Sequence, residues 1–399
     1  MFLTHLSLVN FRNYTRLELD LPARVSVFQG ENAQGKTNLL EAVYYLATTR
    51  SPLAGNDREL IHWAADREVI PHCQVDGAFR RGDSEHTLAY TLVKERANGA
   101  SNGLTTLRRQ IRVDGVPRRA MDVVGQLNVV LFLPEDIRLV SGAPAERRRY
   151  LDITLCQINP QYCRNLARYN RVLAQRNALL RAIRERQARA DELSYWDAQL
   201  AELGSYVVAQ RLHAVAALAV EARRIQSALT AEQEDLALVY TTADELNSAR
   251  EQSAPAADET DALAQRLCVE LQRALGRARA EEIARGVTTV GPHRDDLLFL
   301  LNQTNATVYA SRGQQRTIAL ALKLAEVLLM RTHTGQAPVL LLDDVLSELD
   351  QRRSQLLLAA IAEAEQVLIT TTDLGYYTQA FLSQATRWQV VAGAVMPAI

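Results

Sequence analysis

The chain has 399 residues, 48% of them hydrophobic, which is enough to build two or three domains with cores of their own. Its net charge of −1 excludes a general attraction to nucleic acids, so such a partner would have to be bound by a local basic face. Lysine occurs only at positions 36, 94 and 323, so a lysine inside a glycine-rich loop is distinct from the arginine-rich background.

The N-terminus and the cysteines favour a soluble cytoplasmic protein without a membrane partner. The opening "MFLTHLSLVNF" lacks the basic start and apolar core of a secretory signal. Lys323 and Glu326 interrupt the most apolar helical stretch, and no apolar run reaches the roughly 18 residues that span a bilayer. Cys156 and Cys163 are too far apart for the usual zinc pairing, so we interpret the cysteines as free thiols.

The pattern in the first part of the chain predicts two strands and then a strand–loop–helix unit. Alternating leucines within 6–8 and 17–21 predict two antiparallel strands. "RVSVFQG" (24–30) is a third strand that runs into a glycine-rich loop, and "KTNLLEAVYYLAT" (36–48) is an amphipathic helix. Strands with polar turns are expected to continue through 51–115.

The middle of the chain changes character. "NVVLFLPED" (128–136) predicts a buried strand, and from residue 160 apolar residues recur at three- and four-residue steps. This pattern predicts a helical hairpin that turns near 188–192 and continues towards residue 230. Two polar stretches, 95–103 and 247–261, are interpreted as a loop and a linker.

Strand signals return in the last third. They cover "GVTTVGPHRDDLLFLL" (286–301) and "ATVYAS" (306–311), and a long apolar helix follows. "APVLLLDD" (337–344) predicts a buried strand, and a helix and the strand "QVLITTTD" (366–373) are expected to close the fold.

The glycine-rich loop has the pattern of a phosphate-binding loop, Gly-x4-Gly-Lys-Thr, between a strand and a helix. Its backbone N–H groups would surround the phosphates, Lys36 would reach the β- and γ-phosphates, and the Thr37 hydroxyl would bind Mg²⁺. The predicted nucleotide-binding residues are Gly30, Glu31, Asn32, Ala33, Gln34, Gly35, Lys36, Thr37 and Asn38. A coincidental glycine turn is the alternative, and the flanking strand and helix argue against it.

An apolar strand that delivers two carboxylates at its end resembles a Walker B motif. We expect Asp343 to hold Mg²⁺ and Asp344 to orient and polarise the attacking water, with Lys36 and Asp344 as the catalytic pair. Without the phosphate-binding loop, a strand ending in a polar turn would explain "VLLLDDVLSELD" equally well. Because Lys36 and Asp343 lie near opposite ends of the chain, the sheet that carries both must be split by an insertion.

A third motif begins the long helix at Ser311, Arg312, Gly313 and Gln314. A helix N-terminus preceded by a hydroxyl is suited to an anion, and a simple capped helix start uses the same N–H groups. With the split sheet and the Walker B strand, this Ser-x-Gly-Gln resembles the signature of ABC-type ATPase heads. The resemblance implies that these four residues bind the γ-phosphate of ATP held by a second subunit.

Within that class, the chain resembles the RecF family of bacterial recombination-mediator ATPases. The stretches that carry the resemblance are "NFRNY" (10–14), "FLPEDIRLVSGAPAERRRYLD" (132–152), "GPHRDDL" (291–297) and "SRGQQR" (311–316). The hairpin is far shorter than the coiled coils of SMC proteins and their repair relatives. The resemblance implies an ATP-dependent homodimer that binds duplex DNA near single-strand junctions and hydrolyses ATP slowly. It also implies that the protein helps RecR and RecO to load RecA onto gapped DNA during repair and replication.

We therefore expect an α/β ABC-type head with a split nucleotide-binding sheet, an antiparallel β-subdomain and an inserted helical hairpin lobe. Residues 1–120 would form the first part of lobe I with Walker A. Residues 121–330 would form lobe II with the helical arm and the signature. Residues 331–399 would return to lobe I with Walker B. The alternatives are the ATPase subunit of an ABC transporter, another SMC-like repair ATPase, and a binding module that has lost hydrolysis.

Several residues keep two interpretations. Arg147, Arg148 and Arg149 form a basic cluster that either contacts DNA or belongs to the fold. "FRN" (11–13) is either a contact to the nucleotide base or a surface turn. His293 is either functional or a buried structural histidine. The glutamine that ABC heads place near the γ-phosphate has no counterpart in "VVLFLPED".

Overall fold

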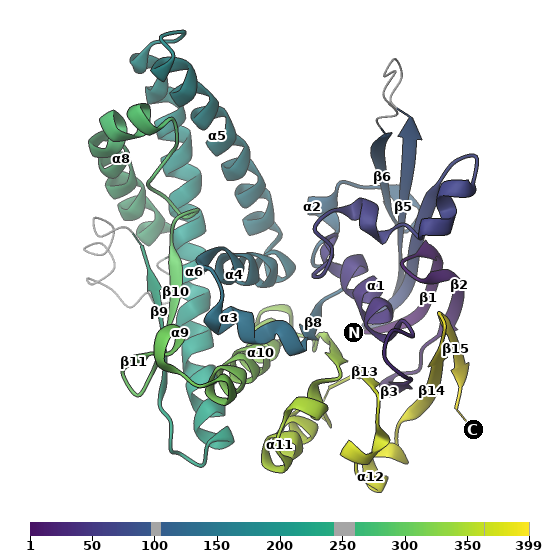
Figure 1. Ribbon diagram of the computed structural model, residues 1–399. Coiled ribbons are helices and arrows are strands. Elements are labelled where there is room, and N and C mark those ends of the chain that lie inside the picture. Colours follow the sequence, from purple (N-terminus) through teal and green to yellow (C-terminus); the bar gives the residue numbers. More distant parts are fainter. Residues whose placement is uncertain (97–104, 243–259, 363, 399) are drawn as a thin grey trace. The chain divides into compact units, whose positions relative to one another are not determined.

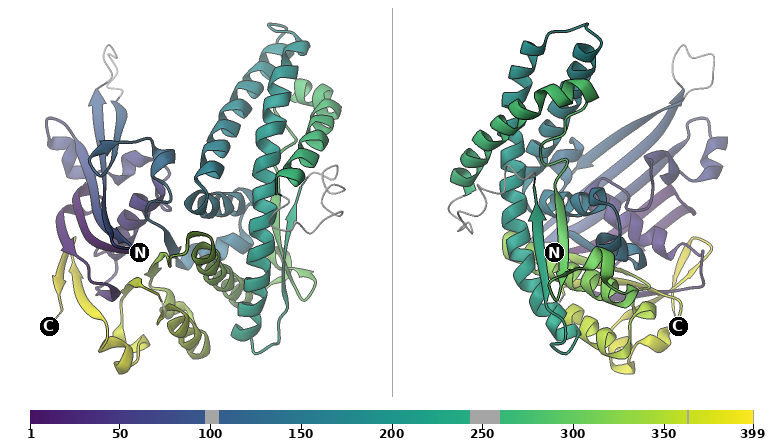
Figure 2. Two further views of the ribbon diagram at one scale, coloured as in Figure 1. Left: turned by 180° about the vertical axis from the view of Figure 1, so that it is seen from behind. Right: turned by 60° about the vertical axis from the view of Figure 1, so that its left-hand side comes forward.

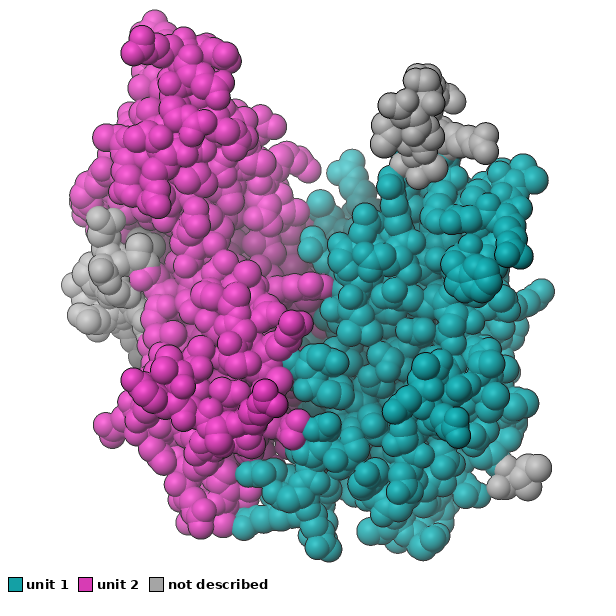
Figure 3. Space-filling model, in the orientation of Figure 1, with its two compact units in different colours: residues 1–136, 326–399 teal, residues 137–325 magenta. Residues whose placement is uncertain are grey.

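The computed structural model describes residues 1–96, 105–242, 260–362 and 364–398. The predicted loop at 95–103 and the predicted linker at 247–261 fall almost entirely outside these ranges. The described chain divides into two compact units, residues 1–136 with 326–399 and residues 137–325 (Figure 3). Both chain ends therefore belong to unit 1, as a split sheet requires.

An antiparallel sheet of six strands forms the first part of unit 1 (Figure 1). In sheet order its strands are β2 (Tyr14–Asp20), β1 (Phe2–Phe11), β4 (His72–Arg81), β5 (Ser84–Arg96), β6 (Thr105–Val113) and β7 (Val116–Pro117). Leu8 lies opposite Leu17, which confirms the two predicted N-terminal strands. Residues of β4 alternate between buried and less buried, as expected when one face of a sheet covers a core.

The second sheet of unit 1 carries the nucleotide motifs. In sheet order its strands are β15 (Ala394–Pro397), β14 (Thr386–Val391), β3 (Arg24–Gln29), β13 (Gln366–Thr371), β12 (Val339–Asp343) and β8 (Val129–Phe132). All neighbours pair in parallel except β14 and β15. Parallel strands share one carboxyl edge, and ligands bind at that edge in such sheets. The split sheet expected from the motif spacing is therefore confirmed.

Unit 1 also contains helices and short 3-10 turns in the connections between its strands. The helices are α1 (Lys36–Thr48), α2 (Ala120–Val123), α11 (Gln351–Ala362) and α12 (Gln379–Leu382), with short 3-10 turns at Asp57–Leu60, Trp63–Arg67, Pro134–Ile137, Val345–Glu348 and Leu374–Tyr376. Helix α1 has the predicted bounds and contacts β8, β12 and β13.

Three expectations about unit 1 differ from the structure. The fold does not close at residue 373, because the antiparallel hairpin β14–β15 follows and β14 pairs with β3. Strand β8 belongs to the sheet of unit 1, since Val129 to Phe132 pair with β12, so unit 1 extends to residue 136 rather than 120. The second boundary lies between Ala325 and Glu326, inside α10, rather than at residue 330.

Unit 2 combines helices with a small antiparallel sheet. The helices are α3 (Arg138–Ser141), α4 (Pro144–Ile158), α5 (Pro160–Arg184), α6 (Leu193–Leu229), α8 (Thr260–Arg285), α9 (Ala306–Tyr309) and the first part of α10 (Arg312–Thr334), with a 3-10 turn at Ala190–Glu192. The sheet has the order β11 (Thr304–Asn305), β10 (Asp296–Leu301) and β9 (Leu236–Thr241).

The helical arm is larger than the predicted hairpin. Helices α5 and α6 form that hairpin, and α8 packs along both of them (Figures 1 and 2). Pro160 occupies the first turn of α5, and the Asn159 side chain accepts a hydrogen bond from the N–H of Tyr162, so the sequence itself starts this helix. The stretch 306–311, predicted as a strand, instead contains the short helix α9.

One helical stretch, residues 190–229 around α6, is long and apolar enough by composition to cross a membrane. More than half of its most apolar window is buried against the rest of the protein. Such burial is typical of a core helix, and α6 packs against α5, α8 and β9.

Candidate nucleotide-binding site

The phosphate-binding loop leaves β3 and enters α1 in a tightly constrained path. The Gly30 N–H donates to the Thr371 oxygen at 3.2 Å, and Gly35 has a φ of +112°, which strongly favours glycine. A Cβ on Gly30 would lie 2.4 Å from the Val390 oxygen, and a Cβ on Gly35 would lie 2.5 Å from the Asn13 side chain. The fold of unit 1 therefore requires both glycines, whether or not a phosphate is bound.

Neighbouring segments hold the tip of this loop from two sides. The Asn13 side chain donates to the Gln34 carbonyl oxygen at 3.0 Å and accepts from the Asn38 side chain at 2.8 Å. On the other side, the N–H of Ala392 donates to the Gln34 side-chain oxygen at 2.6 Å, and the N–H of Gly393 donates to the Gln34 carbonyl at 3.0 Å. The loop is thus fixed in shape by contacts within the chain.

These contacts settle part of the question about "FRN". Arg12 binds both oxygens of Glu41, at 2.8 and 2.7 Å, and donates to the Glu59 carbonyl at 3.0 Å, so its charge is used inside unit 1. Asn13 lies in the turn between β1 and β2, as one of the two interpretations had it, and from there its side chain supports the phosphate-binding loop. The supporting hairpin turn at Ala392–Gly393 was missed, although the apolar run "VVAGAV" with a glycine in its middle is a hairpin signal.

Lys36 is buried at the base of the loop. Its ammonium group donates to the carbonyl oxygens of Gly30 at 2.7 Å and Glu31 at 2.9 Å. Burial lowers the pKa of Lys36, and the carboxylates of Asp344 and Asp343 act in the opposite direction. A phosphate oxygen would give this partly desolvated cation a stronger acceptor than either carbonyl.

Thr37 and Asp343 lie in direct contact, although they are separated by most of the chain. The Thr37 hydroxyl donates to Asp343 at 2.7 Å, and the Thr370 hydroxyl donates to the other oxygen of the same carboxylate at 2.6 Å. Burial raises the pKa of Asp343, the two hydroxyl contacts lower it, and the charges of Asp344 and Glu135 raise it further. A cation at this position would favour the ionised form of Asp343.

This oxygen pair fits Mg²⁺. In the described part of the chain no group of three or more His, Cys, Asp or Glu side chains is arranged to hold a metal. Mg²⁺ needs no such cage, because in nucleotide sites it takes one or two protein oxygens and completes its shell with phosphates and water. Thr37 and Asp343 are the residues that would hold it, and it would neutralise charge on the phosphates.

Asp344 differs from Asp343 in its surroundings. Its backbone has a φ of +48°, and its N–H donates to the Thr370 carbonyl at 3.1 Å. One carboxylate oxygen, Oδ1, is buried and has no hydrogen-bond partner within the described residues. An acceptor in that state is suited to a water molecule at the carboxyl edge of the sheet. The segment after β8, where the sequence offered no glutamine for the γ-phosphate, carries Glu135, whose charge raises the pKa of Asp343.

The predicted signature lies in unit 2 and is exposed. Ser311 precedes α10, and the N–H groups of Arg312 and Gly313 lie in the first turn, where a helix provides no acceptors of its own. A Cβ on Gly313 would meet no described atom within 4 Å. The described residues therefore give no packing reason for a glycine at this position.

The three predicted DNA arginines separate by burial. Arg147 is 3% exposed and binds both oxygens of Asp296, at 2.7 and 2.8 Å, while donating to the Gly142 carbonyl at 2.7 Å. Arg148 donates to the Asp295 carbonyl at 2.8 Å and is half-buried, whereas Arg149 is exposed. Arg147 therefore fits the second interpretation, a structural role, because all three nitrogen atoms of its guanidinium donate hydrogen bonds within unit 2.

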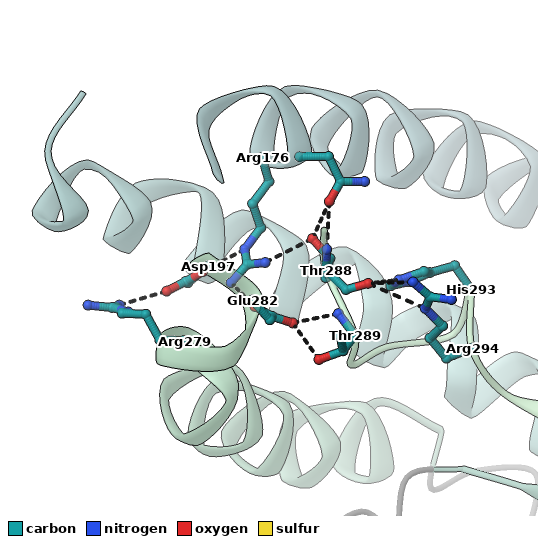
Figure 4. Close-up of polar contacts among 9 residues, drawn as sticks. Arg176, Asp197, Arg279, Glu282, Thr288, Thr289, His293 and Arg294 are labelled. Carbon is teal, nitrogen blue, oxygen red and sulfur yellow. Dashed lines mark hydrogen bonds and ion pairs between the residues drawn. The ribbon is translucent and has the colours of Figure 1, made fainter. Parts of the chain in front are cut away.

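His293 belongs to a polar network that ties the arm together (Figure 4). Its ring contacts the Tyr169 hydroxyl at 2.7 Å and the Thr288 carbonyl at 3.1 Å, and burial lowers its pKa to about 4. In the same network Arg176 binds Asp197 at 2.8 Å and Glu282 at 2.7 Å, which joins α5, α6 and α8. The structural interpretation of His293 therefore fits its surroundings.

Comparison with known proteins identifies the family. Residues 2–393 match the family model for the RecF/RecN/SMC N terminal domain. The chain is 46% identical over 402 residues to the DNA replication and repair protein RecF of Chloroflexus aurantiacus, covering 99% of each chain. It is 36% identical over 397 residues to the protein of that name in Bacillus subtilis, covering 99% of this chain and 100% of the relative.

Solved structures agree with this result. The chain superposes on the recombination mediator protein RecF with ATPrS, of the RecFOR pathway, with a TM-score of 0.83 at 30% identity, covering 100% of this chain and 98% of the other. An Smc head bound to a domain of ScpA gives a TM-score of 0.53 at 13% identity, over 100% of this chain and 97% of the other, which supports the fold alone. With these matches along its whole length, and with a Walker site of the geometry described above, the chain belongs to the RecF family of DNA replication and repair proteins, SMC-like ATPases with an ABC-type head.

Proposed function

We propose that this ATPase is a DNA clamp of recombinational repair and replication restart whose grip is controlled by ATP. Two copies close around two ATP molecules, each bound by the phosphate-binding loop of one copy and the signature of the other. The closed homodimer binds duplex DNA near a single-strand gap, and slow hydrolysis releases it. The protein acts in the cytoplasm.

The observation that carries this proposal is the open first turn at the signature. Lys36, Thr37 and Asp343 already contact their neighbours in unit 1, whereas Gly313 has empty space around it. A glycine that no neighbour requires, at a helix N-terminus suited to an anion, is best explained by a ligand delivered from another molecule. A C2 dimer would deliver two such ligands at once.

The geometry of unit 1 supports the following proposed residue roles. Gly30 to Asn38 surround the phosphates, Lys36 binds the terminal phosphates, and Thr37 with Asp343 holds Mg²⁺. Asp344 orients and polarises the attacking water through its unpartnered oxygen. An aspartate at this position fits a switch that turns over slowly.

The partners are proposed from the relatives. A similar solved structure is described as a recombination mediator of the RecFOR pathway, which supports RecR and RecO as partners. Loading of RecA onto gapped DNA is proposed from the family resemblance given by the sequence motifs. In this chain Arg149 and the half-buried Arg148 remain as candidate DNA contacts of the predicted cluster. Binding should weaken as salt increases, since phosphate contacts release counterions.

A mixed-dimer experiment tests the arrangement across two chains. Lys36→Ala breaks the phosphate-binding loop, and Ser311→Arg blocks the signature, so neither variant alone should form the ATP-dependent dimer. In a mixed dimer both lesions fall in one site and the other site stays intact. Random pairing makes about half of the dimers mixed, so roughly a quarter of the wild-type sites should return.

The readout should include ATP-dependent dimer formation as well as ATP turnover, because strict coupling between the sites would hide recovery in turnover alone. Absence of recovery in both assays, with subunit exchange confirmed, would mean that Ser311 to Gln314 do not bind a partner's phosphate. Gapped duplex DNA should stimulate turnover more than lipid vesicles do, and the reverse would favour a transporter subunit.

A further inference from the structure

The signature turn is closed by two reciprocal hydrogen bonds. The N–H of Ser311 donates to the side-chain oxygen of Gln314 at 2.8 Å, and the N–H of Gln314 donates to the Ser311 hydroxyl oxygen at 3.3 Å. This arrangement is a capping box, in which the first and fourth residues satisfy each other's backbone donors. The side chain of Gln314 therefore fixes the position of Ser311.

The other end of that side chain is bound by a residue outside the signature. The Gln314 amide nitrogen donates to Glu234 Oε1 at 2.9 Å. Glu234 is half-buried and lies between the end of α6 and the start of β9. A hydrogen bond to a carboxylate is roughly twice as strong as one between neutral groups, so Glu234 is a firm anchor for this amide.

Glu234 is itself attached to the helical arm. Its second oxygen accepts a hydrogen bond from the Gln226 amide at 2.7 Å. Gln226 lies in the last turn of α6 and is fully buried, so it cannot move without the helix. One continuous chain of hydrogen bonds thus leads from α6 through Gln226, Glu234 and Gln314 to Ser311.

We propose that Glu234 is a positioning residue of the signature, which holds Gln314 so that Ser311 and the first turn of α10 are preformed for the partner's phosphate. This proposal rests on the proposed function, because it assumes that the signature binds ATP across the dimer. Glu234 itself touches no phosphate. Its effect is to prevent Gln314 from sampling other rotamers, and a preformed site binds more tightly because less ordering is required on binding.

A competing role for the same carboxylate makes the opposite prediction. A negative charge beside an anion site could act as a gate that repels phosphate, and removing the charge would then strengthen dimerisation. Glu234→Gln separates the two roles, because it removes the charge and keeps an oxygen that accepts from Gln314. The new amide nitrogen could donate to Gln226 Oε1, a buried oxygen without a described hydrogen-bond partner, after the Gln226 amide turns over.

The first experiment measures the ATP-dependent dimerisation constant by analytical ultracentrifugation. Glu234→Ala should weaken dimerisation about 10-fold or more, as expected when a charge-assisted hydrogen bond is lost from each site. Glu234→Gln should stay within roughly threefold of wild type if its hydrogen bonds are retained. Glu232→Ala is the matched control, since Glu232 is an exposed glutamate two positions away in the same connection between α6 and β9. ATP binding to the monomer should be the same for all variants, which shows that they fold. Glu234→Ala should unfold at a lower temperature than the other variants, because the buried Gln226 amide loses its acceptor.

The second experiment uses the mixed dimer of Lys36→Ala and Ser311→Arg, whose one intact site takes its signature from the Lys36→Ala chain. Glu234→Ala on that chain should reduce the recovered dimer, and the same substitution on the Ser311→Arg chain should be silent. Adding Glu234→Ala to Gln314→Ala should cost nothing further, because the anchor acts only through Gln314.

The outcomes are distinct. If the unmodified chain forms no ATP-dependent dimer, the proposed function fails and this proposal fails with it. If the unmodified chain dimerises and Glu234→Ala matches it, only the positioning role is overturned. Tighter dimerisation by Glu234→Gln would replace positioning with the gate. Equal effects of Glu234→Ala on either chain of the mixed dimer would reveal a general structural role instead.

Discussion

The phosphate-binding loop and the signature turn both place a glycine and a helix N-terminus where an anion can bind, yet their surroundings are opposite. In unit 1, Asn13, Val390 and Gly393 enclose the loop, and Lys36 and Thr37 already contact oxygen atoms of the chain. In unit 2, Gly313 has no described neighbour within reach of a Cβ. The fold therefore requires the two glycines of the loop, whereas no described neighbour requires Gly313, whose role in the proposed function is to leave room for a partner's phosphate.

In the proposed composite site the two halves have different requirements. The loop is held in shape by contacts within the chain before ATP binds. The first turn of α10 would have to leave space for a ligand carried by another molecule. Substitutions at the two sites should therefore separate stability from assembly, and the predictions below test that separation.

The largest expected effect is on catalysis. Asp344→Asn should lower ATP hydrolysis by about 100-fold or more, the range expected when a group that activates water is lost. ATP binding and dimerisation should persist, so the variant should stay on gapped DNA. Asp343→Asn should instead weaken Mg²⁺-dependent ATP binding. Calorimetric titration and single-turnover hydrolysis measure the two effects, and equal loss of nucleotide binding in both variants would contradict the division of roles.

A second test asks whether the buried Arg147 supports stability while the exposed Arg149 supports DNA binding. Arg147→Gln leaves Asp296 without its bidentate partner, so we expect the free energy of unfolding to fall by about 3 kcal/mol. Arg149 is exposed, so Arg149→Gln should lower stability by less than Arg147→Gln does. If Arg149 contacts a phosphate, the salt slope of duplex binding should become shallower by about 0.9.

Denaturant titration and DNA binding at several salt concentrations measure these effects. An Arg147→Gln variant of wild-type stability would show that its ion pair adds nothing to the fold. An unchanged salt slope for Arg149→Gln would remove this residue from the DNA face.

The local motifs could be predicted from the sequence because each is encoded within a few neighbouring residues. The strand, the glycine loop and α1 are contiguous, and so is the apolar strand that ends at Asp343. These patterns predict a nucleotide site without knowledge of the rest of the fold. The signature was likewise found from its hydroxyl and glycine at the start of a helix.

What the sequence did not predict depends on distant or competing contacts. The hydrogen bond between Gln34 and Ala392 joins residues 358 positions apart, and nothing near either residue indicates it. Three adjacent arginines look alike in sequence, and only the position of Asp296 opposite Arg147 distinguishes them. The β-branched residues of 306–311 favoured a strand, but the Asn305 side chain caps the N–H of Thr307 and starts α9.

One missed element did carry a signal. Helix α8 buries Leu263, Leu267, Leu271 and Leu275, which recur every four residues. That period predicts an amphipathic helix. Because the preceding segment is polar, the linker was predicted to extend to residue 261. The third helix of the arm, which begins at Thr260, was therefore not predicted.

The two glycines provide the most direct test of the comparison. Gly35→Ala should lower the free energy of unfolding by about 2 kcal/mol, because an alanine is strained at its positive φ and its Cβ would clash with Asn13. The free energy of unfolding of Gly313→Ala should equal that of the wild type or exceed it by up to about 1 kcal/mol, since alanine favours a helix. It should nevertheless weaken the ATP-dependent dimer, because the methyl group occupies the space left for a phosphate.

Denaturant titration and sedimentation with ATP measure both quantities for each variant. A Gly313→Ala protein that dimerises as well as wild type would show that the open space at the signature has no role in assembly. A Gly35→Ala protein of unchanged stability would show that the loop tolerates the strain.

The smallest expected effect concerns how firmly the loop is held before ATP binds. Asn13→Ala removes the hydrogen bonds to the Gln34 carbonyl and from the Asn38 side chain, each worth about 1 kcal/mol. Part of that loss lowers stability, and the part that orders the loop should appear as roughly threefold to tenfold weaker ATP binding. Asn10→Ala is the control, since Asn10 lies on β1 just before the turn that holds Asn13, but its amide binds Glu68 at 2.8 Å, away from the loop. Calorimetry on the monomer should show weaker ATP binding for Asn13→Ala alone. Equal affinities for the two variants would mean that the loop needs no support from the turn between β1 and β2, and the contrast with the signature would then rest on the glycines only.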